Sequence, residues 1–536
     1  MHLLDFIQRE SKQSYRAILV VAMLSGLANT LLVFIVNNTT EAFVRGDNLQ
    51  QLLIVYAMTM ALFFQTQWLA FSRSIQLVET ALYNKRVRLT QKIRQLEFPY
   101  VEQTSRSRLY RRLTQNDALI SHAVPQLVYA FQLLMLIVFS LCYLALLSPL
   151  TFLFTLAALI AGLMFFVYRS RQITAALTQV KRKEDGYFAA IAELIEGFKE
   201  IKLNREKADD LMSHILLASA EAETIKIDVH RKEAQMWGFG RLFIYSVLPV
   251  VLFIFPLLAH TQPHHMFQIS ALLLFLMGPI TVVSGMFPIL TRVQQALDEF
   301  VALEQEIDAV LECPLPIPDL DLSNFRQLAV EALGFHFSTG PESFAIGPCD
   351  QIFQRGELLF IIGGNGSGKS TFLKLLTGLY KVQQGRIWVD ETLIGLDNLT
   401  AYRSLFAVIF TDFHLFDRFY GIPDLDSALV ETWIERMGLK GKAGYEQGKF
   451  TTRDLSTGQR KRLAFIAAML EKKPILILDE FAADQDPAFR RDFYEIILPE
   501  LKANGTTVIA VTHDDHYFHV ADRILKMDEG RFVASE

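Results

Sequence analysis

Residues 363–371 have the types and spacing of a loop that binds phosphate groups. They read Gly-Gly-Asn-Gly-Ser-Gly-Lys-Ser-Thr and stand between a strand-like run at 358–362 and a helix-like run at 372–376. Glycines let consecutive backbone N–H groups point at one anion, while Lys369 reaches the outer phosphates and the Ser370 hydroxyl coordinates Mg²⁺. We therefore predict that the chain binds a nucleoside triphosphate. The residues expected to hold it are Gly363, Asn365, Gly366, Ser367, Gly368, Lys369, Ser370 and Thr371.

Two carboxylates end another apolar run further along the chain. Residues 475–478 are Ile-Leu-Ile-Leu, which is typical of a buried parallel strand, and Asp479 and Glu480 follow. Parallel sheets place their ligands at the carboxyl ends of the strands. We predict that Asp479 holds Mg²⁺ through water and that Glu480 polarises the attacking water. A solvated acidic pair is the alternative, which the phosphate loop disfavours.

A polar turn at 455–459, Leu-Ser-Thr-Gly-Gln, precedes three basic residues and an apolar helix. Ser456 is suited to cap that helix, and with Gly458 and Gln459 it marks a helix N-terminus. Such an end can accept a further phosphate.

In their order along the chain, these motifs resemble the nucleotide-binding domain of ATP-binding-cassette (ABC) transporters. The resemblance makes 455–459 the signature loop, with Thr457 where glycine is usual. It makes residues 482–487, Ala-Ala-Asp-Gln-Asp-Pro, the D-loop, and it places Asp486 at the nucleotide. Its implied ligands are ATP and Mg²⁺.

The same resemblance assigns three more residues. His513, after a strand-like run, aligns with the switch histidine that contacts the γ-phosphate, and Phe337 aligns with the aromatic residue that stacks on adenine. A core aromatic is the alternative for Phe337. The segment 410–416 aligns with the Q-loop, where Thr411 replaces the glutamine that contacts Mg²⁺. Either Thr411 or Asp412 substitutes for it, or the contact is missing. A hydroxyl can still bind a water of the metal shell, so we expect altered coupling rather than an inactive ATPase.

In this family two nucleotide-binding domains pair head to tail, with the signature loop of one facing the phosphate loop of the other. The sequence contains one phosphate loop and no internal repeat of it. The resemblance therefore implies a homodimer with composite ATP sites, and a heterodimer with a related half is the alternative.

The residues before 310 have the composition of a membrane domain. The chain has 536 residues, 51% of them apolar, and a mean hydropathy of +0.26, which is too apolar for an ordinary soluble protein. A helix needs about 20 apolar residues to cross roughly 30 Å of hydrocarbon. Six stretches meet or nearly meet this length: 16–36, 52–71, 126–147, 149–168, 240–259 and 267–290.

The positions of Lys and Arg predict the orientation, because they accumulate in cytoplasmic loops. The connection at 73–123 holds ten and that at 169–232 holds twelve, whereas 37–51 holds one. We expect a multi-pass protein of the cytoplasmic (inner) membrane, with both termini and the ATPase domain in the cytoplasm. A cleaved signal peptide is disfavoured because further spans follow the first. Cys142, Cys313 and Cys349 indicate neither a disulfide framework nor a metal cluster.

The two long basic connections have apolar residues at helical spacing and resemble the intracellular extensions of ABC exporters, which carry coupling helices. Residues 98–117 resemble the first coupling region, and we expect the second near 211–218. A proline-spaced segment at 313–318 separates the halves. The predicted fold is an all-α, six-helix membrane exporter domain at 1–310, a linker at 311–325 and an α/β P-loop NTPase domain at 326–536.

Six spans ahead of one cassette is the arrangement of exporter half-transporters. The segments 196–204, 410–416, 455–463 and 481–487 resemble those of bacterial cyclic-peptide exporters, which include transporters of pyoverdine-type siderophore precursors. We therefore predict ATP-driven export of a cyclic peptide, a nonribosomal peptide or a siderophore precursor. A lipid flippase or multidrug exporter is the second hypothesis, and a regulatory membrane ATPase without transport is the third.

The expected partners are a second copy of the chain, membrane lipid and a peptide-like substrate, and no nucleic acid. The sequence does not identify the residues that contact the substrate. Asn29, Gln65 and Gln132 lie inside predicted spans and could line a cavity, with helix–helix hydrogen bonding as the alternative.

Overall fold

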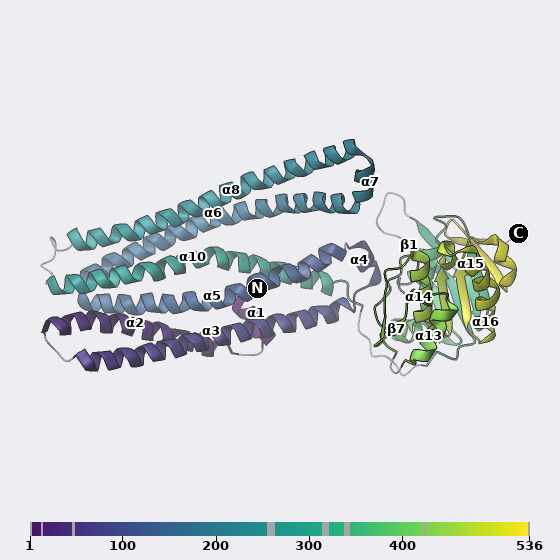
Figure 1. Cartoon of the computed structure of the whole chain (residues 1–536), viewed down its shortest axis with the longest axis horizontal. Helices are drawn as coiled ribbons and strands as arrows, with labels where there is room; N and C mark the ends of the chain where they lie inside the picture. The colour runs from purple at the N-terminus through teal and green to yellow at the C-terminus, as the bar shows by residue number, and fades with distance from the viewer. Residues whose placement is uncertain are drawn as a thin grey trace. The chain divides into compact units, whose positions relative to one another are not determined.

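The computed structural model describes residues 3–11, 14–45, 49–104, 106–254, 263–312, 321–336, 344–422 and 425–533. The chain folds into two compact units. The first holds Met1–Arg94 and Ser105–Ala309, and the second holds Gln95–Thr104 and Val310–Glu536. Long helices make up the first unit, and strands with shorter helices make up the second (Figure 1).

The first unit is a bundle of long helices. α2 packs against α3 and α5, α10 against α5, and α6 against α8. At about 1.5 Å per residue, α3 and α6 are roughly 70 Å long, more than twice the ~30 Å of a bilayer's hydrocarbon, so both extend well beyond a membrane. The elements are α1 (Leu3–Ser11), α2 (Arg16–Arg45), α3 (Leu49–Ile93), α5 (Arg106–Leu147), α6 (Pro149–Glu196), α7 (Phe198–Leu203), α8 (Arg205–Pro249), the π-helical turn η1 (Val250–Ile254) and α10 (Pro263–Asp308).

Five of the six predicted spans fall in described helices that are long and apolar enough to cross a membrane. These are Arg16–Thr39, Leu49–Ile93, Arg112–Leu147, Pro149–Arg169 and Met266–Asp308. The other prediction, 240–259, begins in α8 and continues through η1, and its last residues lie outside the described residues. Its described part appears as a shorter apolar helix, Tyr245–Ile254.

The turn between α6 and α8 corrects one expectation. Residues 211–218, predicted to hold the second coupling turn, lie inside α8, and the chain reverses at 197–204 around α7. The Asn204 side chain accepts a hydrogen bond from the Lys207 N–H at 3.1 Å and so caps α8. The prediction was wrong because apolar residues at helical spacing continue through α7 and conceal the stop at Gly197.

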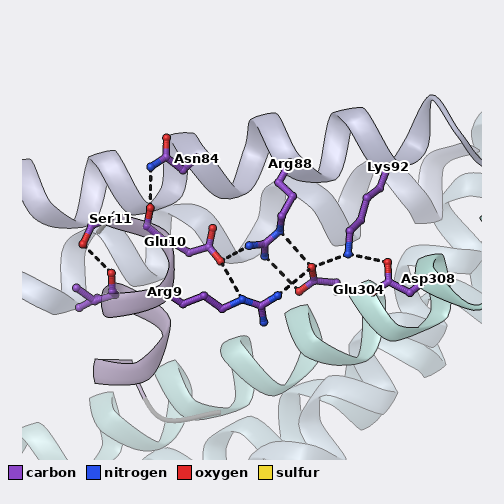
Figure 2. A network of polar contacts seen from close by, with 9 residues as sticks. Arg9, Glu10, Ser11, Asn84, Arg88, Lys92, Glu304 and Asp308 are labelled. Carbon is purple, nitrogen blue, oxygen red and sulfur yellow. Dashed lines mark hydrogen bonds and ion pairs between the residues drawn. The ribbon is translucent and has the colours of Figure 1, made fainter. Parts of the chain in front are cut away.

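A network of charged side chains ties α1, α3 and α10 together (Figure 2). Glu304 of α10 lies 3.1 Å from Arg88 and 2.7 Å from Lys92, both on α3. Arg9 of α1 approaches the same carboxylate at 3.7 Å, and the buried Glu10 pairs with Arg88. Because a buried carboxylate is costly without partners, these contacts hold α1 against the two longer helices.

The second unit contains two main sheets. One is antiparallel, in the order β2-β1-β4-β5, and the other has the order β12-β11-β3-β10-β9-β6, with all strands but β12 parallel. The apolar runs of β3, β9 and β10 are buried, as expected for central parallel strands covered on both faces. A small hairpin, β7–β8, stands apart.

The strands of this unit are β1 (Gln327–His336), β2 (Ala345–Gln354), β3 (Leu358–Ile362), β4 (Gln384–Val389), β5 (Thr392–Leu393), β6 (Phe406–Ile409), β7 (Tyr445–Glu446), β8 (Lys449–Phe450), β9 (Ile475–Asp479), β10 (Thr507–Val511), β11 (Arg523–Asp528) and β12 (Arg531–Val533). Its α-helices are α4 (Phe98–Gln103), α11 (Lys369–Leu376), α12 (Leu399–Arg403), α13 (Ser427–Arg436), α14 (Thr457–Leu470), α15 (Pro487–Asp492) and α16 (Leu498–Ala503).

The segment that carries α4 belongs to this second unit, although the sequence analysis assigned it to the membrane domain. The Glu97 N–H donates a hydrogen bond to the Val310 carbonyl at 3.1 Å, and Leu96 bridges to Leu311. The chain between α3 and α5 therefore packs with C-terminal residues. The proline-spaced residues of the predicted linker lie outside the described part of the chain.

Candidate nucleotide-binding and hydrolysis site

Three neighbouring parallel strands bring the predicted ATP-site segments to one edge of the six-stranded sheet. Val511 of β10 pairs with Ile361 of β3 on one side and with Asp479 of β9 on the other. Segments that follow parallel strands leave the sheet at the same edge. The phosphate loop therefore emerges beside Glu480, which follows β9, and His513, which follows β10.

The phosphate loop closes around its own lysine. Gly363 has φ of 149°, and a Cβ there would lie 2.2 Å from the Met527 carbonyl oxygen, so only glycine fits. The buried Lys369 ammonium donates hydrogen bonds to the carbonyl oxygens of Gly363 at 2.8 Å and Gly364 at 2.9 Å. The Ser367 hydroxyl is buried and has no hydrogen-bond partner among the described residues. A lysine and an unpartnered hydroxyl at one loop suit a phosphate.

A cavity of about 460 Å³ opens at this loop. Gly368 is the N-cap of α11, and Ser370 and Thr371 lie in its first turn. The cavity therefore adjoins a helix N-terminus, where a phosphate is favoured. Its lining includes Gly364, Asn365, Gly366 and Ser367 from the loop, together with Phe344, Asp528 and Arg531.

Asp479 is a buried carboxylate at the end of β9. It is 1% exposed, and neither oxygen accepts a hydrogen bond in the described part of the chain. Burial raises the pKa of Asp479, and the negative charge of Glu480 raises it further. The nearby Ser370 hydroxyl lowers this pKa, although it does not reach hydrogen-bonding geometry. Burial lowers the pKa of Lys369, against the pull of both carboxylates. A divalent cation held by Ser370 and Asp479 would supply the missing partner, so these residues fit Mg²⁺.

Glu480 and His513 face each other at the same edge. The Glu480 Oε1 and His513 Nε2 atoms are 3.4 Å apart, and the side chains are 34% and 48% exposed. Solvent therefore reaches both groups, which an acid or base that handles a water molecule requires.

The signature turn begins α14. The Ser456 Oγ accepts from the Gln459 N–H at 3.4 Å, and the Gln459 side chain accepts from the Ser456 N–H at 3.3 Å, which completes a capping box. A Cβ on Gly458 would lie 2.4 Å from the Asp484 carbonyl oxygen. Within the described residues, no hydrogen bond or ion pair joins this turn to the phosphate loop of its own chain.

Three other predicted residues have different outcomes. Asp486 caps α15 by accepting a hydrogen bond from the Phe489 N–H at 3.0 Å. Thr411 is exposed in the turn after β6, the strand beside β9, and no described bond joins it to the metal-site carboxylate. Phe337 lies outside the described residues, so its contact with adenine stays a prediction.

Both halves of the chain match family models. Residues 15–280 match the ABC transporter transmembrane region, and residues 348–483 match the ABC transporter model. The chain is 33% identical over 419 residues to the ATP-binding protein SyrD of Pseudomonas syringae pv. syringae, covering 74% of this chain and 72% of that protein. The chain belongs to the ABC transporter family.

One further curated protein and one solved structure are also similar to this ABC transporter. It is 28% identical over 268 residues to an ATP-dependent lipid A-core flippase of Chromohalobacter salexigens, covering 46% of this chain and 45% of that protein. A bacterial Atm1-family ABC exporter solved with ATP bound shares its fold, with a TM-score of 0.79, 17% identity and coverage of 97% and 95% of the two chains. The predicted fusion of a helical exporter domain to an ABC ATPase is confirmed. The chain is thus a transport ATPase of the ABC family, with the fold of that exporter structure.

The sequence analysis missed residues that hold the signature turn and D-loop of this ABC transporter together. Gln485 donates to the Gly458 carbonyl at 3.1 Å, and Arg462 donates to the Gln485 side chain at 2.7 Å. Lys461 donates to the Glu480 carbonyl at 2.8 Å. The sequence did contain a signal for the burial of Lys461, because this residue lies at helical spacing between Gly458 and apolar residues of α14.

The first unit, which holds the transmembrane region and is called the membrane unit below, contains another cavity. This cavity has a volume of about 630 Å³ and lies between α5, α6, α8 and α10. Ile137, Phe166, Phe239 and Leu276 are among its apolar lining residues. Thr155 also lines it, and its buried hydroxyl has no hydrogen-bond partner in the described residues. None of the polar span residues singled out from the sequence lines this cavity.

We expect Glu480→Gln to slow steady-state ATP hydrolysis by about 10²- to 10⁴-fold, the usual contribution of a general base, while ATP still binds and stays trapped. Lys369→Ala should instead prevent productive ATP binding. Turnover and retained nucleotide are measured on the same purified protein. Glu446→Gln, an exposed carboxylate in β7, is the matched control and should behave as wild type. Wild-type turnover in Glu480→Gln would remove this residue from the hydrolytic step.

Proposed function

We propose that two copies of this chain form an exporter that hydrolyses ATP at composite sites and moves a peptide-like molecule out of the cytoplasm. The ATPase part rests on the common edge of β3, β10 and β9, where the loop lysine, the buried carboxylate and the Glu480–His513 pair meet. The cargo part rests on the resemblance of four segments, 196–204, 410–416, 455–463 and 481–487, to cyclic-peptide exporters.

Each residue at that edge has a role that its surroundings support. Lys369 would exchange its two loop carbonyls for phosphate oxygens of ATP. Ser370 and Asp479 would hold Mg²⁺, which offsets the negative charge of the phosphates. Glu480 would orient the attacking water, and His513, 3.4 Å away, would contact the γ-phosphate.

The signature turn would complete the ATP site of the partner copy. The N-terminus of α14 carries a partial positive charge and presents backbone N–H groups, which favour a phosphate. The turn makes no described bond to its own phosphate loop, so its phosphate would come from the other chain. Because the sequence holds one copy of each motif, a homodimer is the simplest complete assembly.

α4 would connect the ATP site to the membrane helices. Glu102 of α4 accepts hydrogen bonds from the Lys374 ammonium and the Tyr380 hydroxyl, and Glu97 pairs with Lys381. Burial tends to raise the pKa of Glu102, but these two hydrogen bonds bring it below its usual value, so the contact is ionic at neutral pH. Lys374 lies in α11, which begins at the phosphate loop, and the chain continues from α4 into α3 and α5. A shift of α11 would therefore be passed to the membrane unit.

We place both chain termini and the cassette in the cytoplasm, and the protein in the cytoplasmic membrane. The support is the excess of Lys and Arg in the connections at 73–123 and 169–232, which the positive-inside rule assigns to the cytoplasmic side.

A lipid flippase is the second candidate. The similarity to a lipid A-core flippase and the apolar cavity in the membrane unit both favour it. The cavity would accommodate the apolar part of either cargo, with the Thr155 hydroxyl available for one hydrogen bond. The peptide proposal is preferred because the resemblance to peptide exporters involves segments in both halves of the chain.

The proposed cargo is tested by comparing metabolites of cells with and without the protein, followed by uptake of the accumulated compound into inside-out vesicles. We expect one cyclic or acylated peptide to build up inside cells that lack the protein. Its uptake into vesicles should require ATP and should be absent with Glu480→Gln. Accumulation of a lipid in place of a peptide, with ATP-dependent lipid translocation, would support the flippase instead.

We expect Glu102→Ala to uncouple transport from hydrolysis, because it removes the two hydrogen bonds that Glu102 accepts from Lys374 and Tyr380. Cargo uptake per ATP hydrolysed should fall by about 5- to 100-fold, the usual range of coupling between sites, while basal ATP hydrolysis persists. Gln103→Ala, at the exposed neighbouring position, is the control. If Glu102→Ala and the wild type take up equal amounts of cargo per ATP hydrolysed, the contacts of Glu102 do not couple hydrolysis to transport.

A further inference from the structure

Lys461 is a buried lysine in the nucleotide-binding domain, and the proposed mechanism assigns it no role. It lies in the second turn of α14 and is 3% exposed. Its Nζ donates to the Glu480 carbonyl at 2.8 Å and lies 2.7 Å from the Asp484 Oδ2. A buried ammonium group is costly unless it is paired, so these two contacts fix the position of the Lys461 ammonium group.

The residue that receives this hydrogen bond has an unusual backbone conformation. Glu480 has φ of 50° and ψ of 41°, a left-handed conformation that a residue with a Cβ keeps only when its surroundings enforce it. The Glu480 N–H donates to the Val511 carbonyl at 3.1 Å, and the Glu480 carbonyl accepts from Lys461. The two bonds fix the peptide groups on both sides of Glu480. They therefore fix the direction in which its carboxylate leaves the backbone.

The same region joins Glu480 to the signature turn. Gln485, in the turn that follows Glu480, donates to the Gly458 carbonyl at 3.1 Å. The Asp484 carbonyl oxygen approaches Gly458 so closely that a Cβ would lie 2.4 Å away. The start of α14 and the turn at 480–485 are thus in direct contact, and Lys461 links them by a side chain.

We infer that Lys461 is a positioning residue for ATP hydrolysis, which holds the backbone of Glu480 in its left-handed conformation and ties it to the signature helix. This inference rests on the water-orienting role proposed for Glu480. Lys461 bonds the carbonyl of Glu480 and not its carboxylate, so it acts on the orientation of that carboxylate. ATP of the partner copy, bound at the signature turn, would thereby influence the orientation of the Glu480 carboxylate in this chain.

The test replaces Lys461 by methionine, which keeps an unbranched apolar stem and removes the charge and the donors. In full-length protein in proteoliposomes, we expect kcat for ATP hydrolysis to fall about 10- to 100-fold, as when a reacting group is misplaced, with KM and the Kd for ATP changed by less than about threefold. Lys440→Met, at an exposed lysine whose described partner is Glu435, is the matched control and should keep the wild-type kcat.

Two further variants separate positioning from a loss of folding. Asp484→Asn leaves the Lys461 bond to the Glu480 carbonyl in place, so it should lower kcat far less than Lys461→Met. In single-turnover hydrolysis, Lys461→Met combined with Glu480→Gln should be no slower than Glu480→Gln alone, because residues that act through one group do not add.

A wild-type kcat in Lys461→Met, or a loss of ATP affinity as large as the loss of kcat, would overturn the inference. It would also be overturned if Asp484→Asn lowered kcat as much as Lys461→Met does. The same holds if Lys461→Met slowed the Glu480→Gln protein by as large a factor as it slows the wild type. Wild-type turnover in Glu480→Gln itself would reject the proposed water-orienting role, and the two failures are therefore distinguishable.

Discussion

The register of three parallel strands is the constraint on which the site depends. Val511 pairs with Ile361 on one side and Asp479 on the other, so the segments after β3, β9 and β10 begin at the same level. A slip of one residue in either ladder would reverse the faces of that strand's side chains and displace the phosphate loop from the carboxylates. The apolar, fully buried strands hold this register because neither face can turn to water.

Buried charges at the site are of two kinds. Lys461 has two partners within the nucleotide-binding domain, the Glu480 carbonyl and the Asp484 carboxylate, and these contacts compensate for its burial. Asp479 has two buried oxygens without a described hydrogen-bond donor, and the hydrogen bonds described for the Lys369 ammonium go to two loop carbonyls. An unpaired buried charge destabilises a fold, and a ligand that pairs it gains that energy on binding. The paired charge of Lys461 fixes the geometry of the site, and the charges of Asp479 and Lys369 give the site its affinity for metal and phosphate.

Candidate site residues could be proposed from the sequence alone where they are contiguous. The phosphate loop, the carboxylates at the end of β9 and the signature turn each appear as a short string. The shared edge of the first two follows from the rule for parallel strands. The contacts of Lys461 with Glu480 and Asp484 could not be read in this way, because they join separate elements whose approach is set by tertiary packing. The contact of Glu102 with Lys374 is of the same type. The misplaced turn between α6 and α8 had a local signal at Gly197 and Asn204, which the continuing apolar spacing outweighed.

A single cassette holds every proposed component of an ATP site, but the signature turn and the phosphate loop of one chain make no bond to each other in the described structure. Two chains arranged head to tail would bring each signature turn to the other chain's loop. The membrane unit would then respond to an interface that exists only while ATP is bound, which is a shift of population between two states.

The most direct test of this composite site combines two inactive variants in one dimer. Lys369→Ala disables the phosphate loop, and Ser456→Arg blocks the signature turn, so each homodimer should lack ATP hydrolysis. A heterodimer purified through two different tags contains one site in which both the loop and the signature are intact, and the account predicts that single-turnover hydrolysis returns. A heterodimer as inactive as its parents, or a Ser456→Arg homodimer with wild-type hydrolysis, would contradict it.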